Sequence, residues 1–314
     1  MYWQSIGGMQ RAHAVAHLNL FIYVQGTLVA LTLAIGWALA GSMRRRERLQ
    51  QASRAVAQPT MLLPPESPPQ AGQVENCPQP CTPVAATGQG QAPLLPAVAV
   101  VLPVKGCRTH SLANWSSQVS MQYGGRSSCI FVVGDVEDPA VAAVRQLQAQ
   151  QPAADIQLCV SGPASSCSQK IHNQLAGVVA AGAEVRYVLF LDDDVEPHPH
   201  CLEQLVQCLE ADPSLFMATG YPFDVPPHGA SLATYCTLAY HLPLLIAFSV
   251  RQRTSFVWGG CMLLRRESLD PDHPCGLFKV WRDGGYSDDL LLAALCTEQG
   301  RAIATPSFAI FPQW

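Results

Sequence analysis

Three aspartates in a row, Asp192, Asp193 and Asp194, follow a short apolar run, Tyr187–Leu191. The run is too short for a helix and is apolar at every position, which is typical of a strand buried on both faces of a parallel sheet. Adjacent carboxylates repel one another unless a cation lies among them, and Mg²⁺ and similar ions prefer carboxylate oxygens as ligands. The pattern therefore predicts a divalent-cation site at the end of this strand, with a solvated acidic turn as the alternative.

Other groups that could do chemistry lie earlier in the sequence. Asp135 follows a second apolar run, Ile130–Val133, while Lys170 and Asn173 lie in the first turn of a predicted helix entered through Ser168. A lysine beside the free amide groups of a helix N-terminus favours an anion such as a diphosphate. Taken singly, Asp135 could cap a turn and Lys170 could be a solvated lysine, so their combination with the acids carries the interpretation.

A second acidic pair, Asp288 and Asp289, opens a predicted helix after Gly284–Ser287. Taken alone, the pair could cap this helix and complement its dipole. Open α/β sheets, however, bind ligands beyond the carboxyl ends of their strands. We therefore expect the acids and the lysine to converge on one cleft.

The segments between these groups alternate between strand and helix patterns. Strands are predicted at residues 97–102, 129–133, 156–160, 187–191 and 256–264, and helices at 112–121, from 139, 168–181, 200–210 and 288–298. This alternation predicts an α/β protein with a doubly wound, mostly parallel sheet.

The composition limits the class of protein. The chain has 314 residues, a net charge of −4 and only 13% charged residues. A chain with this balance and no basic face is not typical of nucleic-acid-binding proteins. The low charge content indicates a part that is membrane-embedded or of low complexity.

The first 96 residues account for this composition. Residues 18–40 carry no charged side chain and would reach about 34 Å as a helix, enough to span a bilayer. Because arginines cluster at 44–46, we expect residues 1–17 to be lumenal and everything after residue 41 to be cytosolic; a cleaved signal peptide is the alternative. Residues 41–96 are first basic and then proline-rich, which predicts a disordered linker before a domain at 97–314.

A series of short motifs runs in order through residues 97–314. They are Pro103–Gly106, Asp135–Ala140, Cys167–Asn173, Leu189–Val195, Thr219–Pro222, Trp258–Cys261 and Arg282–Asp289. In this order they resemble the inverting nucleotide-sugar glycosyltransferases of the GT-A fold, and within them the ceramide glucosyltransferases, especially of the plant and algal type. The resemblance implies a Rossmann-like GT-A catalytic domain behind one N-terminal transmembrane helix and a Pro-rich linker.

The resemblance also implies roles for the residues of the predicted cleft. Asp135 would contact the uridine of the donor, and Lys170 and Asn173 would line the nucleotide. Asp192 and Asp194 would hold Mg²⁺ or Mn²⁺ against the UDP diphosphate, where the ion stabilises the charge of the leaving group.

The catalytic pair and the sugar pocket follow from the same resemblance. Asp289, with Asp288 beside it, matches the general base that takes the proton of the acceptor hydroxyl. The sugar and acceptor pocket would be formed by His241, Trp258, Gly259 and Gly260. A structural role in the core is the alternative for His241.

The expected acceptor is a lipid. Residues 238–250 are apolar and contain no acid, so they suit either a helix at the membrane surface or an ordinary buried helix. The implied reaction moves glucose from UDP-glucose to the primary hydroxyl of ceramide, on the cytosolic face of the Golgi or endoplasmic reticulum membrane.

Two alternatives to an active transferase stay open. The family continues to a (Q/R)xxRW motif, whereas this sequence stops at Trp314 before that motif; the resemblance therefore predicts either a C-terminally truncated enzyme or a relative that binds UDP-sugar without turnover. A strand ending in Asp192–Val195 would also suit a haloacid-dehalogenase-like phosphatase, although about three strand–helix units precede it.

Overall fold

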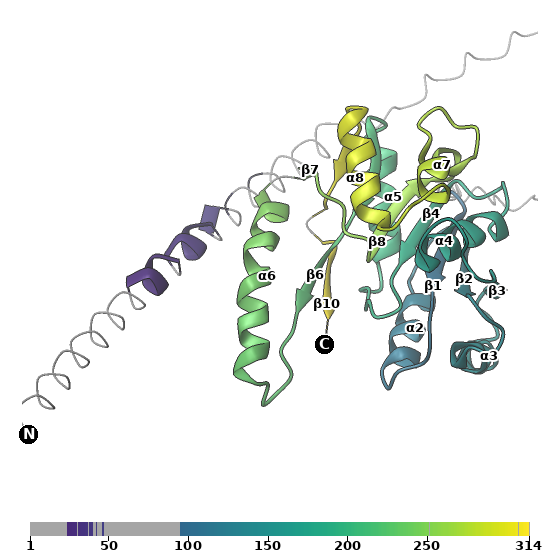
Figure 1. The fold of residues 1–314 in the computed structure, drawn as a ribbon, viewed down its shortest axis with the longest axis horizontal. Coiled ribbons are helices and arrows are strands. Elements are labelled where there is room, and N and C mark those ends of the chain that lie inside the picture. The colour runs from purple at the N-terminus through teal and green to yellow at the C-terminus, as the bar shows by residue number, and fades with distance from the viewer. Residues whose placement is uncertain are drawn as a thin grey trace, which may run out of the picture.

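A computed structural model of the chain describes residues 95–250, 252–306 and 308–313, and in the N-terminal part residues 24–29, 31–36, 38, 39, 42 and 46. The described part contains an eight-stranded sheet of order β3-β2-β1-β4-β8-β5-β9-β7 (Figure 1). Its strands are β1 (Val98–Pro103), β2 (Ser127–Val133), β3 (Ile156–Val160), β4 (Tyr187–Leu191), β5 (Leu215–Thr219), β7 (Arg253–Thr254), β8 (Cys261–Arg265) and β9 (Ala302–Ala304). The predicted α/β class with a mostly parallel sheet is confirmed.

Strands β1 to β4 pair in parallel, and β5 pairs in parallel with β9. Strand β8 runs antiparallel between β4 and β5, with Leu189 opposite Leu263. Because β1, β2 and β4 run the same way, the loops that follow them emerge together at what we call the carboxyl end of the sheet. The acids that follow β2 and β4 therefore share one end of the fold.

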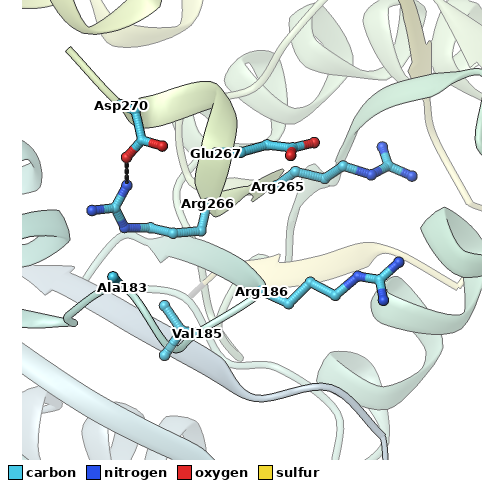
Figure 2. Close-up of a pocket in the computed structure, with 7 residues that line it drawn as sticks. All are labelled: Ala183, Val185, Arg186, Arg265, Arg266, Glu267 and Asp270. Atoms are coloured by element: carbon cyan, nitrogen blue, oxygen red, sulfur yellow. Dashed lines mark hydrogen bonds and ion pairs between the residues drawn. The ribbon is translucent and has the colours of Figure 1, made fainter. Parts of the chain in front are cut away.

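The opposite end, where β4 begins and β8 finishes, is the amino end of the sheet. It contains a hollow of about 400 Å³ lined by Arg186, Arg265, Arg266 and residues of the adjoining turns (Figure 2). Arg265 donates to the carbonyls of Leu215 at 2.5 Å and Leu209 at 3.1 Å. These contacts join the end of β8 to the start of β5 and to the helix that precedes it.

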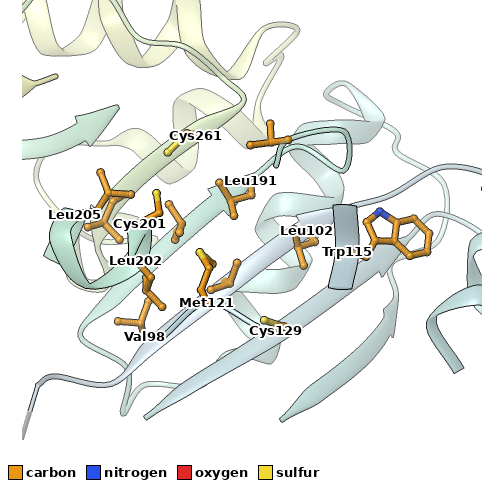
Figure 3. Close-up of a cluster of buried hydrophobic side chains, with 14 of the residues drawn as sticks. Val98, Leu102, Trp115, Met121, Cys129, Leu191, Cys201, Leu202, Leu205 and Cys261 are labelled. Atoms are coloured by element: carbon orange, nitrogen blue, oxygen red, sulfur yellow. The ribbon is translucent and has the colours of Figure 1, made fainter. Parts of the chain in front are cut away.

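Helices cover both faces of the sheet, which explains why β1 and β4 are apolar at nearly every position. One face carries α2 (Ser111–Val119), α3 (Pro139–Gln150) and α5 (Cys201–Ala211), and a part of the apolar cluster beneath them is drawn in Figure 3. The other face carries α4 (Gln169–Ala180), α7 (Leu277–Arg282) and α8 (Asp288–Glu298), with the short helix η1 (Arg266–Leu269) after β8. Trp115 packs on Phe131 in the first layer and Trp281 on Phe190 in the second, both with ring centroids 5.5 Å apart.

A smaller unit stands beside the main sheet. Strand β6 (Tyr221–Asp224) pairs in parallel with β10 (Ile310–Gln313), and α6 (Leu232–Val250) packs beside β6 (Figure 1). Over 232–242 no residue of α6 is buried, and Leu232 and Tyr240 are 80% and 75% exposed. This part of α6 is therefore not an ordinary buried helix, and α6 begins six residues earlier than the predicted apolar segment.

The strand predicted at 256–264 is correct only from Cys261 onward. Residues 255–260 form a loop and turn, and Thr219 of β5 hydrogen-bonds to the residues at this turn. The Thr219 hydroxyl accepts from the Trp258 amide at 3.0 Å and donates to the Cys261 carbonyl at 3.0 Å. The loop brings Trp258, Gly259 and Gly260 to the carboxyl end of the sheet.

Most of the predicted N-terminal arrangement lies outside the described residues. This applies to the lumenal tail 1–17 and to nearly all of the linker 41–96, while the described positions within 18–40 are helical. Among the residues that the structure describes, none of the helices combines the length and apolar character required to cross a membrane. The transmembrane helix is not confirmed and stays a prediction.

Candidate active site

Asp135 and its neighbours occupy the loop after β2. The Asp135 side chain is exposed and accepts from the Glu137 amide at 3.0 Å. Asp138 caps α3 by accepting from Ala140 and also accepts from the Gly106 amide, both at 2.8 Å. Asp138 therefore joins the loops after β1 and β2 and leaves Asp135 open to a ligand.

Lys170 links three separate segments at this end of the sheet. Its Nζ lies 2.7 Å from Oδ1 of Asp192 and 3.1 Å from Oδ2 of Asp288, and it donates to the Gly259 carbonyl at 3.3 Å. The lysine reaches this position because α4 begins directly after Ser168, whose hydroxyl accepts from the Ile171 amide. The predicted convergence of Lys170 with Asp192 and the second acidic pair is therefore present in the structure.

The pKa values of Lys170 and Asp192 reflect the fact that several carboxylates share the single ammonium group of Lys170. Burial raises the pKa of Asp192 to about 6; Lys170 opposes this shift, while Asp288 and Asp194 add to it. Burial acts to lower the pKa of Lys170, but Asp192 and Asp288 together raise it above its ordinary value. The ammonium stays charged, and a single lysine leaves the carboxylates only partly neutralised.

The two acids of α8 have different surroundings. Asp288 is buried, with 6% exposed, and its Oδ2 accepts from Nε2 of Gln174 at 2.7 Å. Asp289 is only half-buried; it accepts from the Gly259 amide at 3.3 Å and the Leu290 amide at 2.7 Å. Asp288 therefore belongs to the interior of the site, and Asp289 is the acid that a substrate can reach more easily.

The glycines after Trp258 are required by close packing. A Cβ on Gly259 would lie 2.9 Å from Oδ1 of Asp288 and 3.2 Å from Nζ of Lys170. A Cβ on Gly260 would lie 2.2 Å from the Trp258 indole, whose other neighbour is Phe311 at 5.5 Å between ring centroids. Gly259 thus gives the lysine and the buried acid the space they occupy.

Asn173 is buried and uses its amide within the protein. Its Nδ2 donates to the Val132 carbonyl at 3.1 Å, and its Oδ1 accepts from the Ser161 hydroxyl at 2.7 Å and from Gln169 at 2.8 Å. These bonds hold the loop after β3 against β2. The predicted contact of Asn173 with the donor stays a prediction.

Two hollows adjoin the acidic triplet on the side of α2 and α6. One, of about 630 Å³, is lined by Asp193, Asp194, Arg108 and His110, among others. The other, of about 470 Å³, is lined by Asp194, Asp224–Pro227, Ala233, Thr234 and Thr237. Because both include Asp194 and Pro227, the exposed acid Asp194 lies where the two hollows meet.

His241 does not contact Lys170 or its partners but pairs with an acid that the sequence analysis did not select. Its Nδ1 contacts Oδ2 of Asp224, the last residue of β6. Gln174, the partner of Asp288, was also missed. Because Gln174 lies four positions after Lys170 on α4, helical spacing could have placed it on the same face; no comparable local signal linked Asp224 to His241.

The donor set suits a metal that is held jointly with a ligand. Within the described residues, no group of three histidine, cysteine or acidic side chains forms a metal site. Mg²⁺ and Mn²⁺ at phosphate-binding sites commonly use one or two carboxylates, with phosphates and waters completing the shell. Asp192 and Asp194 fit that arrangement.

Together, a mostly parallel sheet and an acidic, lysine-bridged carboxyl end define an α/β protein with its ligand site at the strand ends. The model of glycosyl transferase family 21 matches residues 79–305, more than two thirds of the 314-residue chain. The chain belongs to glycosyl transferase family 21. This membership sets aside the phosphatase alternative.

Two solved structures are similar to the chain. One is the mannosyltransferase PcManGT from Pyrobaculum calidifontis in complex with GDP-Man and Mn²⁺, with 16% identity and a TM-score of 0.46 over 69% of this chain and 56% of that one. The other is S. aureus TarS 1–349, with 10% identity and a TM-score of 0.48 over 68% of this chain and 59% of that one. The chain therefore spans less than two thirds of the length of either structure.

Proposed function

We propose that this protein is a membrane-anchored inverting glycosyltransferase of the GT-A type that moves glucose from UDP-glucose to the primary hydroxyl of ceramide. The observation that carries the proposal is the bridge from Lys170 to Asp192 at 2.7 Å and to Asp288 at 3.1 Å. It joins the start of α4, the end of β4 and the start of α8 in one site. Family membership supports a sugar transfer at this site.

The nucleotide part of the donor is assigned to the side of the site that holds Asp135 and Lys170. The exposed Asp135 carboxylate is available to the uridine. The ammonium of Lys170, near the first turn of α4, favours the diphosphate. Asp192 and Asp194 would hold Mg²⁺ or Mn²⁺, which supplies positive charge to the departing diphosphate.

Asp289 is the proposed base. As the ceramide oxygen forms its bond to the anomeric carbon, the hydroxyl proton passes to Asp289 and the bond from that carbon to the UDP oxygen breaks with inversion. The half-buried Asp289 is fixed by the Gly259 and Leu290 amides. Asp288 pairs with Lys170 and accepts a hydrogen bond from Gln174, which keeps the lysine in place. Trp258, Gly260 and His241 would contact the sugar and the acceptor.

The proposed location is the cytosolic face of the Golgi or endoplasmic reticulum membrane. It rests on the uncharged segment 18–40 and on the arginines at 44–46 that follow it. An apolar acceptor that resides in the membrane agrees with such an anchor.

The test is an incubation of membranes bearing the full chain with radiolabelled UDP-glucose and ceramide, followed by separation of the lipids. We expect labelled glucosylceramide and an equal amount of UDP, and a rate about 10³-fold lower from membranes bearing Asp289→Asn. UDP-galactose and a sterol, each replacing one substrate, test the choice of hexose and acceptor. Binding of UDP without any labelled lipid would refute the transferase proposal in favour of a binding-only relative.

A further inference from the structure

The hollow between Asp194 and α6 has a distinct chemical character. One wall is Asp194 at the carboxyl end of the sheet, and the opposite wall is formed by Asp224 and the early turns of α6, with Thr234 and Thr237. The described residues that line the hollow include no lysine, arginine or histidine to bind a phosphate, whereas the Asp224 carboxylate and the two hydroxyls can hydrogen-bond to a neutral, hydroxyl-bearing molecule. The hollow therefore suits the head of an alcohol better than a nucleotide.

The exposed surface of α6 suits the remainder of such a molecule. Leu232, Tyr235 and Tyr240 are 80%, 50% and 75% exposed, and the sequence of α6 contains no acidic or basic residue other than His241. The absence of charged side chains along α6 agrees with an acceptor that carries an apolar chain.

Asp224 fixes His241 on this same part of α6. The Asp224 carboxylate contacts Nδ1 of His241, so Nδ1 carries the proton and the other ring nitrogen, Nε2, is left to the surroundings. Tyr221 donates its hydroxyl to the His241 carbonyl at 3.1 Å, which joins β6 to α6 a second time. Thr234, Thr237 and His241 are three and four positions apart and share one face of the helix.

We propose that Asp224 is a positioning residue of the acceptor subsite, which is the hollow between Asp194 and Thr234–Thr237. It sets the tautomer and orientation of His241 and so orients the hydroxylated head of an acceptor with an apolar chain. The proposal rests on the proposed transferase function for the identity of the acceptor. Two observations support the positioning role of Asp224: its contact with the His241 ring and the place of the hollow beside Asp194.

The first test compares Asp224→Asn with the wild-type full chain in steady-state kinetics. The amide keeps the shape of the side chain but loses the charge that orders His241. Loss of a charge-assisted bond predicts a fall of about tenfold in kcat/KM for ceramide, with KM for UDP-glucose unchanged within about twofold. Asp224→Glu should recover part of the loss, and Asp272→Asn, on an exposed loop, is the matched control.

An equal loss for both substrates, or no loss at all, would overturn the positioning role. A second measurement does not depend on turnover: ¹⁵N spectra of histidine-labelled protein report the tautomer, and His241→Gln identifies the signal. We expect protonated Nδ1 in the wild type and a mixture of tautomers in Asp224→Asn. Identical His241 signals in both proteins would also contradict the proposal.

Binding of a short-chain fluorescent ceramide separates this proposal from the proposed reaction. Suppose that the wild type binds this probe but transfers no glucose, and that Asp224→Asn binds the probe about tenfold more weakly. In that case the proposed reaction is wrong and the proposed subsite stands. If glucose is transferred while Asp224→Asn binds the probe as the wild type does, the reaction stands and the subsite is wrong.

Discussion

The two ends of the central sheet differ in how fully their charged side chains are paired within the protein. At the amino end, the guanidinium groups have internal partners: Arg186 pairs with Glu210 at 3.3 Å, Arg266 pairs with Asp270, and Arg265 binds two carbonyls. At the carboxyl end, Lys170 pairs with Asp192 and Asp288. Asp193, Asp194 and Asp289 have no ion-pair partner in the part of the chain that the structure describes.

This difference separates charges that are paired within the protein from acids that are not, and the unpaired acids belong to the proposed site. Arg186 and Arg265 lie over the Tyr187 ring at 5.9 and 6.0 Å, and the Tyr187 hydroxyl donates to Glu210 at 2.5 Å. That network is complete without any added group. The carboxyl end keeps an excess of acid, which a cation and a donor with a leaving diphosphate would complete.

The largest effect is expected from Asp289→Asn, which removes the proposed base without changing its size. Loss of a general base predicts a fall of about 10³-fold in kcat. UDP affinity, measured by calorimetry with Mn²⁺ present, should stay within about threefold, because asparagine keeps the shape of the side chain and Asp289 is not itself one of the assigned nucleotide groups. A large loss of UDP binding would show instead that Asp289 belongs to the donor site.

Asp192→Asn is expected to have the next largest effect. It removes one proposed metal ligand and leaves Lys170 paired with Asp288 alone. We expect a loss of about a hundredfold in kcat/KM and weaker binding of Mn²⁺ by electron paramagnetic resonance. Unchanged Mn²⁺ binding would assign the metal to other groups, and Asp270→Asn at the amino end is the matched control.

Gly259→Ala tests whether the lysine bridge depends on close packing. The added methyl would meet Asp288 at 2.9 Å and Lys170 at 3.2 Å, so these groups must move. A shift of this kind predicts a fall of about 10- to 100-fold in kcat/KM. The control is Ala294→Gly, on the exposed side of α8, which introduces no clash. Gly300→Ala does not serve as a control because the positive φ of 61° at Gly300 would add backbone strain. Full activity of Gly259→Ala would show that the bridge is not needed for transfer.

The strands that place the acids were predictable because local sequence determines them. Tyr187–Leu191 is apolar on both faces, and the strand has these bounds. Lys170 was correctly placed because Ser168 is a strong N-cap signal. Parallel strands then bring Asp135 and Asp192 to one end of the sheet, so a linear pattern was sufficient for this part of the site.

The rest depends on contacts that no local pattern encodes. The segment 255–260 was predicted as a strand because Phe256 and Val257 are apolar, whereas the turn is held in part by the distant Thr219. The partner of His241 is Asp224, seventeen positions away on another element. Strands β5 and β9 are short and pair in parallel although they lie far apart in the sequence, so no local pattern predicts them.

Arg265→Met tests the amino end, where we expect an effect on stability and not on transfer. The side chain is half-buried and gives up two charge-assisted bonds to backbone carbonyls, at 2.5 and 3.1 Å. The loss predicts about 2 kcal/mol of destabilisation, measured by thermal unfolding of the purified full chain, with UDP affinity unchanged. A fall in UDP affinity without a loss of stability would mean that the two ends are coupled.

Arg186→Gln should have the smallest effect and completes the comparison within the amino end. Its side chain is 60% exposed, and its partner Glu210 is 35% exposed. Water screens such a pair, so we expect a change in stability of at most about 0.5 kcal/mol. Thermal unfolding of both variants gives the contrast directly, because both guanidinium groups lie over the same Tyr187 ring but differ in burial and in their hydrogen-bond partners. If Arg186→Gln were as destabilising as Arg265→Met, the stability of the amino end would come from its charges as a set and not from the buried bonds of Arg265.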